Sequence, residues 1–152
     1  MNLSSRNKSH LDNALQSNGL RSTRQREVVY GVILGERDHP TADEIYSRAK
    51  QAMPSISLAT VYNCLETLVE CGLVRQVNFE RESTRFCPNL SEHAHFYCRE
   101  TGRVYDIPLS HATVKELSHA LPNEFEMETF ELTFRGHGPE DAAEVDRETA
   151  GS

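Results

Sequence analysis

The stretch Ser57-Leu-Ala-Thr-Val-Tyr-Asn-Cys-Leu-Glu-Thr-Leu-Val-Glu-Cys-Gly72, with the residues that follow it as far as Cys87, decides the fold of the first half of the chain. Its apolar residues recur at helical spacing, and they are Leu58, Val61, Leu65 and Leu68. Ser57 is a typical N-cap and Gly72 a typical helix end, so an amphipathic helix is predicted. After Gly72 the apolar period changes, which predicts two strands at 73–79 and 84–87 joined by the polar tip 80–83.

Three shorter helices are predicted before this one. The first contains Leu11 and Leu15 and ends at Gly19. The second begins at a capping box over 22–25 and runs toward Gly35, and the third begins at a capping box over 41–44 and ends at Pro54. Helices followed directly by a hairpin are typical of a winged helix-turn-helix, in which the helix after Ser57 reads the DNA groove.

The sequence of the second half predicts a small α/β unit, so the fold class expected for the whole chain is α+β. A hairpin is expected from strands at 95–98 and 103–107 about Gly102, with Asp106 opposite His95, followed by a helix at 113–121. Alternating apolar residues over 125–134 predict one long strand with a bulge. The predicted organisation is a DNA-binding domain at 1–88, a hinge at 89–92, a dimerisation domain at 93–137 and a disordered acidic tail at 138–152.

Charge is divided unevenly along the 152 residues. Residues 1–78 hold nine basic and eight acidic residues, whereas the remainder holds seven basic and fifteen acidic ones. This division favours a DNA-contacting module joined to a part with another role, although an unevenly charged solvated surface gives the same count. No apolar run is long enough to span a bilayer, and the start lacks a secretory signal, so a cytoplasmic protein is expected. The four cysteines are not spaced as a disulfide framework.

Two groups of residues are predicted to contact DNA. Phosphate contacts are expected from Arg21, Arg24 and Arg26. Base-edge and nearby contacts are expected from Ser57, Ala59, Thr60, Tyr62 and Asn63, which lie off the apolar stripe of the fourth helix. A solvated helix face is the alternative interpretation of the second group.

A metal site is the second prediction from the residues. His93 and His95 share one face if they lie in a strand, Cys87 precedes them across a turn, and His39 and Asp106 are further candidate ligands. Thiolate and imidazole together favour zinc over magnesium or manganese. Surface histidines without a ligand role are the alternative interpretation of an isolated His-x-His.

Four blocks of sequence in this order resemble the ferric uptake regulator (Fur) superfamily. They are 19–26 (GLRSTRQR), 39–46 (HPTADEIY), 57–62 (SLATVY) with 71–74 (CGLV), and 93–95 (HAH) with 102–106 (GRVYD). The resemblance implies a homodimeric, metal-responsive transcriptional regulator that binds double-stranded operator DNA, and a regulatory metal at the hinge. It places His39 on the family's hinge histidine, His93 and His95 on its His-x-His, and Asp106 on its later carboxylate.

The chain departs from the family pattern at several positions. Cys87 stands where iron- and peroxide-sensing members usually have Asp or Glu, which resembles zinc-sensing relatives. The structural zinc that the family usually holds with two Cys-x-x-Cys pairs is predicted to be absent, since Cys98 is paired with Thr101 and the segment 136–141 has no cysteine. A further family site is also expected to be lost, because its ligand positions hold Ala94, Thr113 and Phe130. Asn63 replaces a frequent arginine, which puts the usual operator sequence in doubt.

The leading hypothesis is therefore a zinc-dependent repressor with one metal site per subunit, formed by His39, Cys87, His93, His95 and Asp106, with His39 and Asp106 the least settled ligands. Iron, manganese or haem at the same site, and a redox switch at Cys87 in response to peroxide, remain alternatives. A zinc hydrolase is a remote alternative, because no motif of the His-Glu-x-x-His type supplies a general base, and no enzyme is expected.

Overall fold

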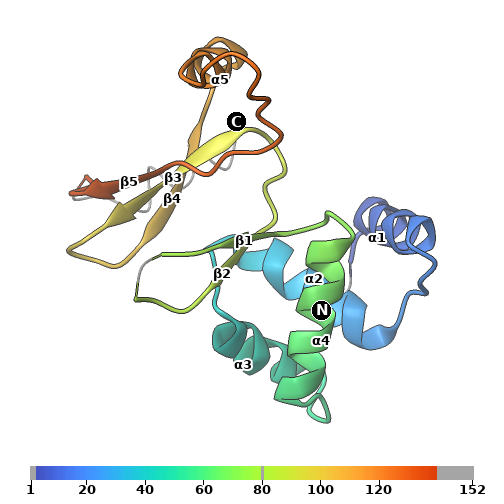
Figure 1. Cartoon of the computed structure of the whole chain (residues 1–152). Coiled ribbons are helices and arrows are strands. Elements are labelled where there is room, and N and C mark those ends of the chain that lie inside the picture. The colour runs from blue at the N-terminus through green and yellow to red at the C-terminus, as the bar shows by residue number, and fades with distance from the viewer. Residues whose placement is uncertain (1–2, 80, 140–152) are drawn as a thin grey trace. The chain divides into compact units, whose positions relative to one another are not determined.

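The computed structural model describes residues 3–79 and 81–139 and divides into two compact units. The first unit is Met1–Leu90 and the second is Ser91–Ser152. Each is described by itself below, with element labels as in Figure 1. The fold class is α+β, as predicted. Of the predicted acidic tail, residues 140–152 lie outside the described part of the chain. None of the described helices is both long and apolar enough to cross a membrane.

Each helix of the first unit begins at a polar N-cap residue whose side chain accepts a hydrogen bond from the backbone N–H three residues further on. The helices are α1 (Ser5–Ser17), α2 (Arg24–Glu36), α3 (Ala42–Ala52) and α4 (Leu58–Glu70). Thr41 caps α3 and Ser57 caps α4, which confirms both predicted helix starts. The left-handed conformation of Gly19 (φ 72°) and of Gly72 (φ 73°) explains why α1 and α4 end next to these glycines.

Both ends of α2 differ from the prediction by one residue. Thr23, rather than Ser22, accepts the capping hydrogen bond from the Arg26 N–H, at 3.2 Å. The helix also continues past Gly35 to Glu36, and Arg37 takes the left-handed position with φ 51°. Arg37, rather than the glycine, therefore takes the left-handed position at the end of α2.

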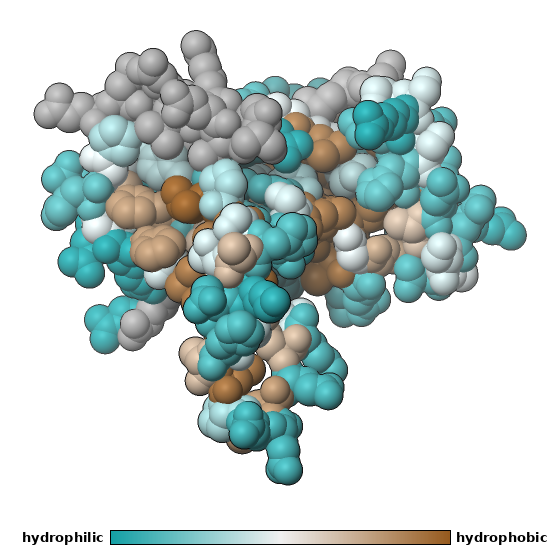
Figure 2. All heavy atoms as spheres, turned by 90° about the horizontal axis from the view of Figure 1, so that it is seen from above, coloured by the Kyte–Doolittle hydropathy of each residue, from teal (hydrophilic) through white to brown (hydrophobic). Residues whose placement is uncertain are grey.

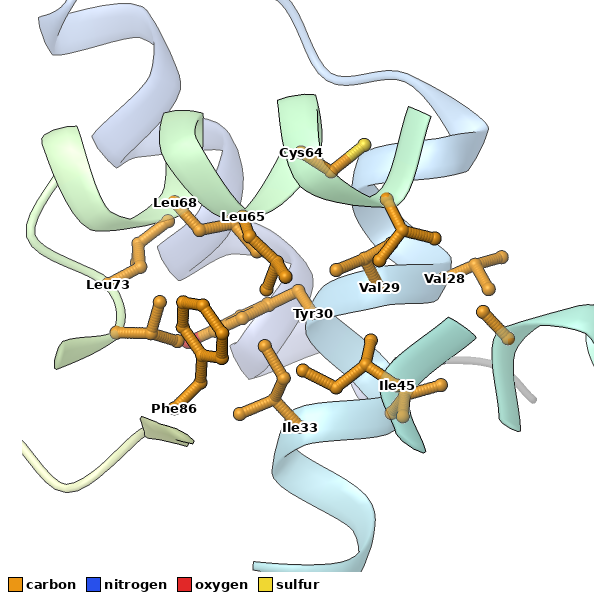
Figure 3. Close-up of a cluster of buried hydrophobic side chains, with 14 of the residues drawn as sticks. Val28, Val29, Tyr30, Ile33, Ile45, Cys64, Leu65, Leu68, Leu73 and Phe86 are labelled. Carbon is orange, nitrogen blue, oxygen red and sulfur yellow. The ribbon is translucent and has the colours of Figure 1, made fainter. Parts of the chain in front are cut away.

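The core of the first unit lies between α2, α3, α4 and the strand β2 (Figure 3). Leu11 and Leu15 of α1 belong to the same cluster of buried residues. The inner face of α4 is formed by Val61, Cys64, Leu65 and Leu68. Leu58 was predicted to belong to this face but is 37% exposed. At about 100° per residue, Leu58 lies at the edge of the buried stripe, and Cys64 occupies the inner position instead.

The predicted hairpin after α4 is present but short. Strand β1 (Arg75–Val77) pairs antiparallel with β2 (Arg85–Cys87), and Arg75 lies opposite Cys87. Leu73 and Val74 precede the ladder and are buried in the core instead of extending the strand. The predicted tip at 80–83 contains residue 80, which lies outside the described residues. The helix followed by a short hairpin makes the first unit a winged helix (Figure 1).

The second unit is built on a three-stranded sheet with the order β4-β3-β5. Strand β3 (His93–Cys98) is antiparallel to β4 (Val104–Pro108) and parallel to β5 (Thr133–Gly136). Helix α5 (His111–His119) follows β4, two residues earlier than predicted. The predicted turn about Gly102 is confirmed, since this glycine has φ 72° and the Cys98 N–H donates to the Arg103 carbonyl across the turn.

The single long strand predicted over 125–134 is wrong. Only the end of this segment pairs with β3, as β5, and Glu124 at φ 75° turns the chain before it. Period-2 apolar alternation produces a strand only where a neighbour supplies the hydrogen bonds. The segment leaves apolar side chains in solvent, with Phe125 66% and Phe134 46% exposed. Figure 2 shows such hydrophobic side chains interspersed among hydrophilic ones on the face that it draws.

Candidate metal centre and DNA-binding face

The second unit brings His93, His95 and Asp106 together. The two histidines alternate along β3 and therefore lie on one face of the sheet, and Asp106 on β4 lies directly opposite His95. This is the register that the hairpin spacing predicted. His93 is buried, and His95 and Asp106 are partly buried.

The distances within this cluster match the spacing of metal ligands. The Nε2 atom of His93 lies 3.2 Å from Nε2 of His95 and 3.4 Å from Oδ1 of Asp106, and the same oxygen lies 3.3 Å from Nε2 of His95. Ligand atoms placed about 2.0–2.1 Å from a tetrahedral zinc ion are about 3.3–3.4 Å apart. The three atoms therefore have the geometry of one face of a zinc coordination tetrahedron.

A backbone contact orients the His93 ring. Its Nδ1 lies 2.7 Å from the carbonyl oxygen of Ser91. Because a carbonyl only accepts, the hydrogen is on Nδ1 and the Nε2 lone pair faces His95 and Asp106, as in metal-ligating histidines held by a second contact. Sequence reasoning missed this partner, since a backbone carbonyl has no residue-type signature.

The first unit brings His39 and Cys87 together. Both side chains are buried, with 4% of His39 and none of Cys87 exposed, and their ligand atoms lie within 4.8 Å of one another. His39 lies in the loop between α2 and α3, and Cys87 is the last residue of β2. Arg85 lies two residues before Cys87 on β2, and its guanidinium donates to the His39 carbonyl at 3.1 Å. This contact ties the His39 loop to the strand that carries Cys87.

The same loop is tied to β2 by its backbone. The Phe86 N–H donates to the Pro40 carbonyl at 3.0 Å, and Thr41 forms an isolated antiparallel bridge with Arg85. Loop and wing strand thus form one ordered element, which explains how residues 48 positions apart come together.

The donor set fits a transition-metal ion. The Nε2 atoms of His93 and His95 both lie close to one oxygen of Asp106. Lone pairs on these atoms repel one another unless a cation or a proton lies between them. Imidazole, carboxylate and thiolate ligands together are those of a zinc site, whereas a magnesium site would use oxygen ligands. The residues of this chain therefore meet the chemical requirements of a site for zinc or a similar ion.

The outer face of α4 carries the residues predicted to contact bases. Ser57, Ala59 and Asn63 are exposed, Tyr62 is 52% exposed and Thr60 is partly buried. No Lys or Arg occurs in Leu58–Glu70. This face therefore offers small, apolar and amide groups to a DNA groove, and cationic contacts have to come from another element.

The arginines at the start of α2 can supply those contacts. Arg21 and Arg24 are exposed and Arg26 is partly buried. The guanidinium of Arg26 donates to the Arg21 carbonyl at 2.6 Å, which holds the two residues together at the helix N-terminus. A helix N-terminus with exposed guanidinium groups is suited to phosphate.

The other cysteines have different surroundings. Cys64 is buried and Cys71 is partly buried, as predicted, and burial raises the pKa of both thiols. Cys98 differs, because a hydrogen bond from the Thr101 hydroxyl and others from the backbone of Gly138 and Thr101 lower its pKa to about 7.

A model described as the ferric uptake regulator family matches residues 17–135. The chain belongs to this family. The match reaches into both units, and it includes α2 to α5, the strands β1 to β4 and most of β5. Membership in a family of regulators argues against the zinc hydrolase considered above.

Similarity to individual family members is moderate. The peroxide-responsive repressor PerR of Staphylococcus saprophyticus is 36% identical over 93 residues, which are 61% of this chain and 63% of that protein. The alignment thus spans just under two thirds of the curated relative.

Solved structures extend the likeness over more of the chain. The Campylobacter jejuni peroxide stress regulator has a TM-score of 0.66 and 30% identity, with 93% of this chain and 100% of that chain covered. The Vibrio cholerae ferric uptake regulator has a TM-score of 0.68 and 25% identity, with 84% and 98% covered.

Proposed function

We propose that this chain is a dimeric, metal-responsive transcriptional regulator, most simply a repressor, that binds operator DNA through its winged helix. The observation that carries the proposal is the triangle of ligand atoms from His93, His95 and Asp106, with edges of 3.2 to 3.4 Å. The buried pair His39 and Cys87 supports it from the other unit.

In the proposed site, His39 and Cys87 would bind the same ion as the triangle, so that one ion links the two units. The ion would supply a cross-link rather than a reaction. A ligand shifts a conformational equilibrium only by its difference in affinity for the two states, so metal must bind more tightly to the arrangement that fits DNA. Sharing ligands between two units would provide this difference, because the complete donor set would form only in an arrangement that brings the ligands of both units to one ion.

Zinc is the ion that we favour. The thiolate of Cys87 is a soft ligand that suits zinc better than manganese or magnesium. Its buried place at the end of β2 beside His39 supports a ligand role over that of an exposed reactive thiol.

Binding to DNA would use α4 and the start of α2. The exposed face with Tyr62 and Asn63 would enter the major groove, and Arg21 and Arg24 would contact phosphates. A second copy would supply the other half-site, so that the two α4 helices would read half-sites separated by about one or more turns of DNA.

The second unit supports a homodimer. Its sheet has β4 and β5 at its described edges, and Phe125 and Phe134 are 66% and 46% exposed. Open strand edges and exposed aromatic side chains are features that association with another copy would cover.

A peroxide-responsive regulator that uses iron or manganese is the second candidate function. The curated relative with 36% identity and the C. jejuni structure are both named for peroxide, which is the specific observation in its favour. The His93, His95 and Asp106 triangle alone suits iron or manganese as well as zinc. In this variant, oxidation at the metal site or of Cys87 would release the ion and the DNA.

The proposal is tested by selecting duplexes from a random DNA pool with zinc-loaded protein and measuring their affinity with and without zinc. We expect zinc to tighten binding of the selected duplex about 5- to 150-fold, the usual range of coupling between sites. Cys87→Ser should lose this response, whereas Cys71→Ser, at a partly buried thiol in the same unit, should keep it. Zinc-independent binding, or a full zinc response in Cys87→Ser, would overturn the proposal. Release of the duplex by hydrogen peroxide from iron-loaded but not zinc-loaded protein would favour the second candidate.

A further inference from the structure

The loop that carries His39 has an unusual backbone. Arg37 has φ 51° and His39 has φ 56°, so two residues other than glycine lie in the left-handed region, on either side of Asp38. This region costs an L-residue roughly 1–2 kcal/mol. His39 also precedes Pro40, and a residue before proline normally prefers an extended conformation. The imidazole is therefore presented by a backbone that the local sequence disfavours.

A strained conformation persists only where the surrounding structure holds it. The Phe86 N–H and the Arg85 guanidinium bind the carbonyls of Pro40 and His39 from the β2 side. From α3, the two guanidinium nitrogens of Arg48 bind the two carboxylate oxygens of Asp38 at 2.9 and 2.8 Å. Paired, charge-assisted contacts of this kind fix orientation as well as distance.

Helix α3 aims Arg48 at the loop. Its side chain reaches the N-terminal end of the helix, where Glu44 one turn earlier lies 3.6 Å away and Thr41 caps the first turn. Only a planar, forked side chain can bind both oxygens of Asp38 at once, so lysine would not replace it fully. The ion pair is partly exposed, with 28% of the Arg48 and 40% of the Asp38 side chain accessible. Exposed ion pairs are usually weak, but a bidentate arginine–carboxylate pair with this geometry is the arrangement that does contribute.

We propose that Arg48, acting through Asp38, is a positioning residue that holds His39 in its left-handed conformation, with the imidazole beside Cys87, ready to bind the metal ion. This inference rests on the proposed function, because it assumes that His39 and Cys87 are metal ligands. Without the clamp, the backbone at His39 relaxes toward the extended conformation favoured before proline, and the imidazole leaves Cys87. The ion pair then determines metal affinity without contacting the metal.

The test is the zinc affinity of the full chain, measured by competition with a chromophoric chelator, in Arg48→Met, Arg48→Lys and the matched control Lys50→Met. Lys50 is exposed on the same helix and lies over the Tyr46 ring, away from the loop. Loss of a partner that orients a metal ligand typically costs about 10- to 100-fold in metal affinity. We expect a loss in this range for Arg48→Met, a smaller loss for Arg48→Lys, and no change for Lys50→Met.

A second measurement separates positioning from a general loss of structure. In a His39→Ala background, Arg48→Met should cause no further loss of zinc affinity, because the residue through which it acts is gone. An equal loss in both backgrounds, or unchanged affinity in Arg48→Met, would overturn the inference. Thermal unfolding of the metal-free proteins checks that Arg48→Met remains folded. Equally tight zinc binding by the wild type and by Cys87→Ser would instead contradict the proposed function, so the two failures are distinguishable.

Discussion

Substitution of Arg24 by glutamine should lower the salt dependence of DNA binding in a measurable way. Arg24 is exposed at the first residue of α2. A positive charge at a helix N-terminus opposes the helix dipole, so its removal should not destabilise the fold. The expected effect is therefore confined to contacts with phosphate.

The magnitude follows from counterion release. If Arg21, Arg24 and Arg26 each neutralise one phosphate in both subunits, log K falls with log salt with a slope of about −5.4. Loss of Arg24 from both subunits removes two contacts and changes the slope to about −3.6. Between 50 and 200 mM salt, the wild-type affinity should then fall about 1,800-fold and that of the variant about 150-fold. At 100 mM salt the variant should bind about 60-fold more weakly, if counterion release is the whole effect.

The assay is fluorescence anisotropy with the selected duplex at five or more salt concentrations in the presence of saturating zinc. Lys115→Gln is the matched control, because it removes one positive charge from the exposed face of α5 in the other unit. The control should keep the wild-type slope. An unchanged slope for Arg24→Gln, or an equal change for both variants, would refute the assignment of the α2 arginines to phosphate.

Three further predictions concern other parts of the chain. Asn63→Arg should shift one position of the selected half-site from adenine toward guanine by about 1–3 kcal/mol, checked by repeating the selection, and an unchanged preference would mean that Asn63 does not read a base. Zinc at 100 times the wild-type dissociation constant should stabilise the wild type against unfolding by about 2.7 kcal/mol and Cys87→Ser by clearly less, and equal stabilisation of both proteins would count against a thiolate ligand. In the metal-free protein, one thiolate absorbance step should occur near pH 7 and be missing in Cys98→Ser, because the Thr101 hydroxyl lowers the pKa of Cys98. The pKa of Cys98 in the folded protein lies below the ordinary value of 9.0, so its thiolate stabilises the folded state fully above pH 9. This contribution to the free energy of unfolding is lost as the pH falls through about 7.

The local signals in the sequence located the elements well. Helix ends and tight turns depend on the backbone of only a few residues, so their signals are local. The caps Thr41 and Ser57 and the left-handed glycines 19, 72 and 102 are observed where they were predicted. The opposition of His95 and Asp106 was also predictable, because a hairpin with a short turn allows few registers.

Properties that depend on distant partners were less predictable. The segment from Phe125 has the alternation of a strand but pairs only at its end, and Leu58 has the period of a core residue but lies at the edge of the buried stripe. The orientation of His93 by the Ser91 carbonyl and the clamp of Asp38 by Arg48 left no pattern in the sequence, because each is made by tertiary geometry. Residue types and spacing supplied the candidate ligands, the resemblance to the family placed them at its metal site, and the structure supplied the distances and the contacts that orient them.

The most direct test of the central claim is the X-ray absorption spectrum at the zinc edge of protein loaded with one zinc ion per subunit, recorded for the wild type and Cys87→Ser. We expect one sulfur ligand at about 2.3 Å with nitrogen and oxygen ligands at about 2.0–2.2 Å in the wild type, and loss of the sulfur in the variant. A zinc shell made only of nitrogen and oxygen in the wild type, or a sulfur that persists in Cys87→Ser, would contradict it.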